Sequence, residues 1–191
     1  MTGDLRQETA IQQQKEGMHI FYCSRQLDKY IEKAVAFVEQ GILAGDQVMF
    51  VENMRIYPMV RQQLEERLTA EQLEQVHYVD NFTFYWKNRS FHPETILAHF
   101  IEITGGFQGT DGHVRTWGHI EWGDDQDIAQ EIAAYETALE KLVSETNGFS
   151  VCAYDASRLA DDLKKKLLAL HNYYMTDTET ASFLETRNMA N

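Results

Sequence analysis

The residues with the clearest potential for chemistry lie in the stretch HVRTWGHIEW, at positions 113–122. Side chains two residues apart on a β-strand project from the same face of the sheet. His119 and Glu121 would therefore share a face as weak candidates for metal binding, with Asp80 or Asp155 as a third ligand from a neighbouring strand end. Because metal sites need several converging ligands that this spacing does not supply, we predict no metal.

The polar residues of this stretch have a simpler interpretation as paired structural groups. Alternation places Arg115 and Trp117 on the same face as His119 and Glu121. We expect Arg115 to pair with a carboxylate such as Glu136 or Glu121, since buried charges are usually paired.

A second candidate stretch is the turn after the first predicted strand, Cys23-Ser24-Arg25-Gln26. A phosphate-binding loop needs glycines that expose backbone N–H groups, a lysine for the phosphates and a Ser or Thr for Mg²⁺. This turn has no glycine and no Lys-Ser or Lys-Thr pair, and Arg25 is its one cation. We therefore predict no nucleotide hydrolysis, while anion binding through Arg25 and the following helix N-terminus stays open.

Aromatic residues gather in a third stretch, NFTFYWKNRSF, which contains Phe84 and Trp86 and shows no clear periodicity. We expect a loop over one end of the sheet. With Trp117 and Trp122 it would line an apolar pocket for a small organic ligand, since such pockets are mostly apolar and aromatic. A lid over the sheet or an oligomer contact explains the same residues equally well.

The elements that position these residues alternate along the chain. Apolar strand-like runs occur at 19–23, 47–52, 76–80, 113–122, 149–155 and 172–176, and amphipathic helical patterns at 27–42, 55–75, 93–103, 127–146 and 158–171. This alternation predicts a three-layer α/β domain with a mostly parallel central sheet flanked by helices. Ligands of such sheets bind at the carboxyl ends of the strands.

The residues that we predict to bind a ligand therefore come mainly from the stretches that follow or end these strands. They are Arg25, Phe84, Trp86, Arg115, Trp117, His119, Glu121 and Asp155. Asp155 has an alternative role as a cap of the next turn.

Composition limits the partners. The chain has 191 residues, with 30 acidic and 17 basic residues and a formal net charge of −13. This charge repels nucleic acid and anionic membranes. No apolar run approaches the roughly 20 residues of a membrane helix, and no signal-peptide core is visible, so we expect a cytoplasmic protein. Cys23 and Cys152 lie in apolar runs, which predicts buried, reduced thiols.

Several motifs together resemble one known family. They are Gly17 with His19, GILAGD, MFVE, RTWGHIEW, AYETALEKL, and VCAYDASRL with LLALH. Over residues 17–176 this set resembles the MEDS domain, a methanogen and methylotroph sensory domain. The resemblance implies a RecA-like fold without the phosphate loop, and a sensory role in prokaryotic signalling, proposed for small hydrocarbon-derived ligands. His119 stands where the family tends to have an acid, and Glu121 would reach the same face.

These observations predict a tail at 1–16, a sensory domain at 17–176 and an extension at 177–191. We expect a non-catalytic module without cofactors that binds a small ligand or a signalling protein at the carboxyl edge of the sheet. A nucleotide- or metal-dependent hydrolase using His119, Glu121 and Asp155 is one alternative. A structural protein that dimerises through its aromatic loop is another, and fold analogy favours a homo-oligomer.

Overall fold

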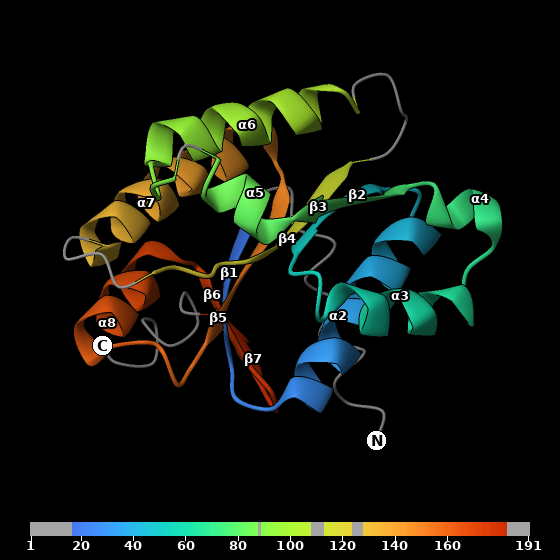
Figure 1. Ribbon diagram of the computed structural model, residues 1–191, viewed down its shortest axis with the longest axis horizontal. Coiled ribbons are helices and arrows are strands. Elements are labelled where there is room, and N and C mark those ends of the chain that lie inside the picture. The colour runs from blue at the N-terminus through green and yellow to red at the C-terminus, as the bar shows by residue number, and fades with distance from the viewer. Residues whose placement is uncertain (1–16, 88, 108–112, 124–127, 183–191) are drawn as a thin grey trace.

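The computed structural model describes residues 17–87, 89–107, 113–123 and 128–182, which form one sheet with helices on both faces (Figure 1). The strand order is β3-β2-β4-β5-β1-β6-β7. The pairings among β1 to β6 are parallel, and β7 pairs antiparallel with β6. The strands are β1 Met18–Ser24, β2 Gln47–Glu52, β3 Val76–Asp80, β4 Val114–His119, β5 Phe149–Asp155, β6 Tyr173–Thr176 and β7 Thr180–Ser182. This confirms the predicted three-layer α/β fold with a mostly parallel sheet.

The helices divide between the two faces of the sheet. They are α2 Leu27–Leu43, α3 Tyr57–Glu65, α4 Ala70–Leu73, α5 Asn81–Tyr85, α6 Pro93–Gly105, α7 Ile128–Thr146 and α8 Asp161–Leu170. Residues of α2, α3 and α4 pack in one hydrophobic cluster, and residues of α5 to α8 pack in another. Figure 1 shows α6 and α7 on one side of the sheet, with α2 and α3 on the other.

The strands supply both clusters because successive side chains point to opposite faces. In β1, Ile20 and Tyr22 join the cluster under α2, whereas Phe21 and Cys23 join the cluster under α7 and α8. All seven residues of β1 are buried. A strand covered on both faces reads as a continuous apolar run, which is the pattern that predicts a parallel sheet.

Helix α2 connects β1 to β2, which are not neighbours in the sheet. Its buried residues recur at three- and four-residue spacing from Tyr30 to Ile42, and the chain turns at Gly45, whose φ of 86° suits glycine. The connection from β1 to β2 crosses two strand positions, because β5 and β4 lie between these strands in the sheet.

One local prediction needs correction. The stretch expected to be a loop contains α5, whose N-cap Asp80 accepts a hydrogen bond from the backbone N–H of Thr83. In the predicted extension 177–191, β7 adds a short antiparallel strand to the sheet edge. The N-cap position of α8 is Ala160. The predicted tail 1–16 lies outside the described residues. Within the described part of the chain, no helix combines the length and apolar character that a membrane span requires.

Candidate functional site

Two groups of polar side chains stand out, and the first lies at the carboxyl edge of the sheet between β2 and β4. The chain leaves β2 toward α3 on one face and leaves β4 toward α7 on the other. Such a reversal is the usual ligand position in open α/β sheets. Glu52 and Asn53 come from the end of β2, while His119 and Glu121 come from the end of β4.

Glu52 is the centre of this edge network, which also contains Tyr30, Asn53 and His119. Its side chain is fully buried and accepts hydrogen bonds from the Tyr30 hydroxyl (2.5 Å), the His119 Nδ1–H (2.6 Å) and the Asn53 backbone N–H (2.8 Å). Burial by itself lowers the pKa of His119, but the hydrogen bond and charge of Glu52 outweigh it and raise that pKa. The Trp117 Nε1–H donates to the Tyr30 oxygen at 2.8 Å, which fixes the hydroxyl.

Glu121 belongs to a neighbouring set of contacts. Its carboxylate accepts hydrogen bonds from the side-chain amides of Asn53 (3.0 Å) and Asn81 (2.7 Å). Burial raises the pKa of Glu121, but the Asn81 hydrogen bond and the charge of His119 outweigh burial, so the pKa is lowered. His119 faces Glu52 rather than sharing a ligand position with Glu121. Trp86 donates its Nε1–H to the Glu121 carbonyl at 3.2 Å.

The turn after β1 already holds an anion, and it comes from the chain itself. The Asp177 carboxylate accepts hydrogen bonds from the backbone N–H groups of Arg25 (2.9 Å) and Gln26 (3.1 Å), and from the Tyr22 hydroxyl (2.8 Å). These are the groups that would meet a phosphate at the start of α2. Asp177 therefore occupies the backbone N–H groups at which an external anion would bind in this turn.

The predicted site residues do not all meet. Arg115 lies at the amino end of β4, where it forms a buried ion pair with Asp46 and its guanidinium lies 4.9 Å from the Phe149 ring. The expected pairing of Arg115 with Glu136 or Glu121 is therefore wrong. Trp117 and Phe84 are buried in the clusters on opposite faces of the sheet. The void that both residues border has a volume of only about 10 Å³, which is too small for an organic ligand.

The remaining predicted residues, Arg25, Trp86, His119, Glu121 and Asp155, lie at or just beyond the carboxyl ends of the strands. Asp155 accepts hydrogen bonds from the Ser157 backbone N–H (2.8 Å) and hydroxyl (2.7 Å), which confirms its role as a cap of that turn.

The second group, which sequence reasoning missed, is a buried cluster of His19, Glu136, Cys152 and His171. It joins β1, α7, β5 and the residue after α8, on the face opposite to α2. His19 Nε2 lies 3.1 Å from Glu136 Oε2 and 3.2 Å from Cys152 Sγ, and His171 Nε2 lies 3.4 Å from the same Glu136 oxygen.

The electrostatics of this buried cluster centre on Glu136. Burial raises the pKa of Glu136, but the two histidines outweigh burial, so the pKa lies far below its usual range. Burial lowers the pKa of His19, while the neighbouring carboxylates of Glu136 and Glu140 outweigh burial and raise that pKa. Burial and the charge of Glu136 raise the pKa of the Cys152 thiol well above its ordinary value. Both cysteines are free and buried, as predicted.

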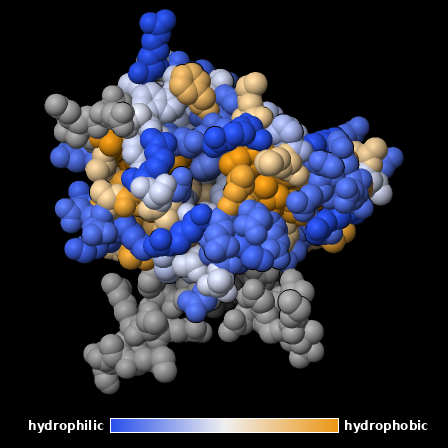
Figure 2. All heavy atoms as spheres, turned by 60° about the horizontal axis from the view of Figure 1, so that its bottom comes forward, coloured by the Kyte–Doolittle hydropathy of each residue, from blue (hydrophilic) through white to orange (hydrophobic). Residues whose placement is uncertain are grey.

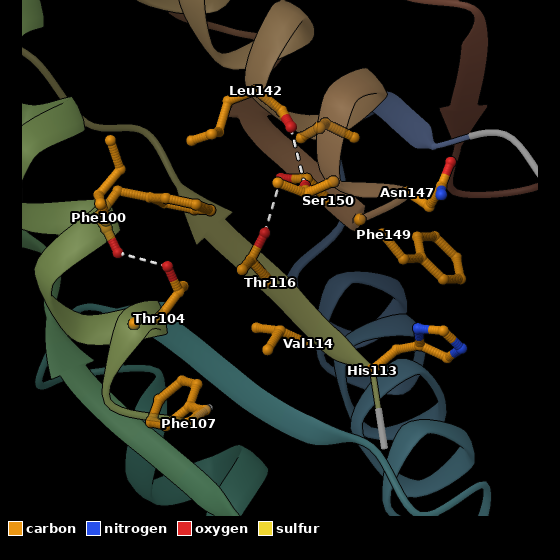
Figure 3. A pocket seen from close by; sticks show the side chains of 15 residues that line it. Phe100, Thr104, Phe107, His113, Val114, Thr116, Leu142, Asn147, Phe149 and Ser150 are labelled. Atoms are coloured by element: carbon orange, nitrogen blue, oxygen red, sulfur yellow. Dashed lines mark hydrogen bonds between the residues drawn. The ribbon is translucent and has the colours of Figure 1, made fainter. Parts of the chain in front are cut away.

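A cavity of about 380 Å³ lies between α6 and α7 near the amino ends of β4 and β5 (Figure 3). Its walls include Phe100, Phe107, Leu142 and Phe149. Thr116 donates a hydrogen bond to Ser150 at 2.7 Å, and both side chains line the cavity. This cavity is at the opposite end of the strands from the predicted ligand edge.

Comparison with known proteins identifies the family. The model of the MEDS family, described as "MEthanogen/methylotroph, DcmR Sensory domain", matches residues 18–172. The chain belongs to the MEDS family. This assignment confirms the resemblance seen in the motifs and supports a role in sensing or signalling. No curated protein matches the chain.

A solved structure from Pyrococcus horikoshii OT3, titled "Structural study of Project ID PH0250", shares the fold with a TM-score of 0.57. The two sequences are 9% identical over 92% of this chain and 90% of that one. At this identity the likeness shows the fold alone.

Proposed function

We propose that this MEDS domain is a non-catalytic sensory module that binds a small organic ligand in the cavity between α6 and α7. The observation that carries the proposal is the cavity itself, whose volume of about 380 Å³ falls within the range of small-molecule sites. Binding there would bias the packing of α6 and α7, which contact each other, and differential packing is what a sensor needs.

The lining indicates the class of ligand. No Asp, Glu, Lys or Arg stands among the described residues that line the cavity, and His113 is the titratable group at its rim. Aromatic and aliphatic side chains provide apolar contacts, whereas the Thr116 and Ser150 hydroxyls offer hydrogen bonds (Figure 3). This chemistry suits a small, mostly apolar molecule with one hydroxyl or carbonyl group, and it is unsuited to a nucleotide triphosphate.

The proposal is tested by thermal shift with a panel of short alcohols, ketones and halogenated alkanes. We expect members of the panel to raise the melting temperature of the native chain. Leu142→Trp would fill the cavity and abolish that increase. Leu43→Trp is the control, because Leu43 is 65% exposed at the end of α2 on the other face. No shift in the native chain, or an undiminished shift in Leu142→Trp, would refute the proposal.

A second candidate is association through the carboxyl edge, where a signalling partner would bind. Leu27, Met54 and Phe82 follow the ends of β1, β2 and β3, and their exposed fractions are 50%, 75% and 69%. Figure 2 shows apolar patches surrounded by hydrophilic side chains on the side that carries the start of α2. Exposed apolar groups of this kind mark interaction surfaces.

The partner we propose to test first is a second copy of the chain. Light scattering over a range of concentrations is expected to give a mass above that of the monomer for the native chain. The double substitution Met54→Ser and Phe82→Ser is expected to give a monomer with unchanged thermal stability. Equal masses for the two proteins would argue against association of copies through this edge.

A further inference from the structure

The buried cluster of His19, Glu136, Cys152 and His171 holds side chains of the types that bind transition metals. Their exposed fractions are 0%, 0%, 1% and 3%, respectively. One potential ligand atom from each residue lies within 4.8 Å of all the others. Because the residues come from β1, α7, β5 and the end of α8, only the folded chain brings them together.

Both imidazole rings are anchored through the nitrogen that faces away from the cluster. The His171 Nδ1–H donates to the Leu167 carbonyl at 2.7 Å, and the His19 Nδ1–H donates to Glu140 Oε2 at 2.8 Å. When both imidazoles are neutral, as metal binding requires, these bonds fix the tautomer in which the Nε2 atoms carry the lone pairs that face the cluster. Metal-binding histidines are held in this way by a carbonyl or carboxylate on the second nitrogen.

Two atoms at the centre lack the hydrogen bonds that burial demands. Glu136 Oε2 and His171 Nε2 are buried side-chain atoms without a hydrogen-bond partner, although they lie 3.4 Å apart. The other carboxylate oxygen, Oε1, accepts from the Tyr154 hydroxyl. A buried carboxylate oxygen without a hydrogen bond is costly. A positive charge beside it relieves that cost, and either a proton on the histidines or a bound metal ion supplies such a charge.

We propose that these four residues form a binding site for a divalent transition-metal ion, with Zn²⁺ the best fit. Ligand atoms about 2.0–2.3 Å from a tetrahedral ion lie roughly 3.3–3.8 Å from one another. The separations of 3.1, 3.2 and 3.4 Å within the cluster are close to that spacing. Two imidazole nitrogens, one thiolate and one carboxylate complete the tetrahedron, so the site is structural and leaves no position for a substrate.

Charge also balances in the proposed site. On binding, the Cys152 thiol loses its proton to solvent, and the thiolate and the Glu136 carboxylate neutralise the two positive charges of the ion. Because the ligands are buried, the ion would enter as the chain folds. The bound ion would link α7 and the end of α8 to β1 and β5 through its four ligands. This inference does not depend on a ligand in the α6–α7 cavity.

The test uses the full, untagged chain, refolded from urea with Co²⁺ under reducing conditions. We expect one ion per chain by elemental analysis, visible bands of tetrahedral Co²⁺ and a thiolate-to-cobalt charge-transfer band. Cys152→Ser is expected to lose the charge-transfer band. Cys23→Ser is the matched control, because Cys23 is also a buried strand cysteine but lies outside the cluster, and it is expected to keep the band.

A second variant separates binding from folding. Glu140→Gln keeps the size of the residue that anchors His19 and is expected to weaken Zn²⁺ binding about 10- to 100-fold, measured by competition with a chelating dye. The proposal is overturned if chain refolded with Zn²⁺ or Co²⁺ has native circular dichroism but holds no stoichiometric metal. It is also overturned if Cys152→Ser, or His171→Gln should that serine variant not fold, leaves the cobalt spectrum unchanged.

Discussion

Two buried carboxylates, Glu52 at the carboxyl edge and Glu136 in the buried cluster, have the same kinds of neighbours but different hydrogen bonding. Each accepts a tyrosine hydroxyl and each lies beside histidine. Both oxygens of Glu52 receive donors. Glu136 Oε2 instead faces two histidine nitrogens without a hydrogen bond.

This difference distinguishes a structural network, in which every hydrogen bond is made, from a group of side chains that can still bind a ligand. A buried carboxylate with a full set of donors is stable by itself, since every polar group has a partner. A buried carboxylate oxygen without a hydrogen bond needs a positive charge beside it, which protonated histidines or a bound metal ion supply. The edge network is the group that sequence patterns favour as the ligand site. Of the two groups, it is the one whose buried carboxylate has its hydrogen bonds without any ligand.

The largest effect is expected from Glu136→Ala. Removing this fully buried carboxylate leaves Tyr154 and two histidines without their central partner, and we expect a loss of about 3–5 kcal/mol in unfolding free energy. Urea denaturation in the presence of a chelator measures the effect without metal. Glu140→Ala is the control, since the Glu140 side chain is 25% exposed and its loss should cost less. Equal losses in the two variants would contradict the central role of Glu136.

The edge network is tested by His119→Gln, whose effect should depend on pH. His119 faces Glu52 and Tyr30, with Glu121 and Asp155 nearby, and its folded-state pKa is raised. A raised pKa gives stability that is fully present below the unfolded pKa of about 6.5 and is lost as pH rises through the folded value.

We therefore expect His119→Gln to cost about 2 kcal/mol at pH 6, the size of a charged hydrogen bond, and less at pH 9. Urea denaturation at both pH values measures the difference. His77→Gln is the control, because burial lowers the pKa of His77 and its partner Gln47 is uncharged. A cost for His119→Gln that grows with pH would show that the ion pair with Glu52 does not stabilise the fold.

A smaller loss of stability is expected from a substitution at the turn after β1. Asp177→Ala removes the acceptor for two backbone N–H groups at the start of α2, which should cost about 1–2 kcal/mol, as for the loss of a helix cap. Thermal or urea unfolding measures it. Asp162→Ala is a suitable comparison, because the Asp162 side chain is 95% exposed. An unchanged stability would mean that water replaces the carboxylate without cost.

The fold class could be predicted from the sequence because the patterns that identify each helix and strand lie within that element. Apolar runs such as FSVCAYD and the stripe from Tyr30 to Ile42 each identify an element without reference to the rest of the chain. Strand order is not local, and neither is the route of Asp177 back to the turn at Arg25, 152 residues away.

The buried cluster was missed for the same reason. His19 and Cys152 are 133 residues apart, and spacing along the chain does not show that they meet. One signal was present: each cluster residue lies in a different motif of the family resemblance, namely Gly17 with His19, AYETALEKL, VCAYDASRL and LLALH. At the edge, His119 and Glu121 were correctly placed near each other, but their partners Glu52, Asn53 and Asn81 come from other strand ends.

The smallest loss of stability is expected for a solvent-exposed ion pair. Comparing this loss with that of Glu136→Ala isolates the contribution of burial. Arg61 pairs with Glu65 at 2.7 Å on α3, with side chains 35% and 54% exposed. We expect Arg61→Ala to change the unfolding free energy by no more than about 0.5 kcal/mol, because solvent screens the pair. Urea denaturation in low and high salt measures it. If this exposed pair contributed as much as Glu136, charge pairing alone would explain both effects, and burial would not be the reason for the large loss expected from Glu136→Ala.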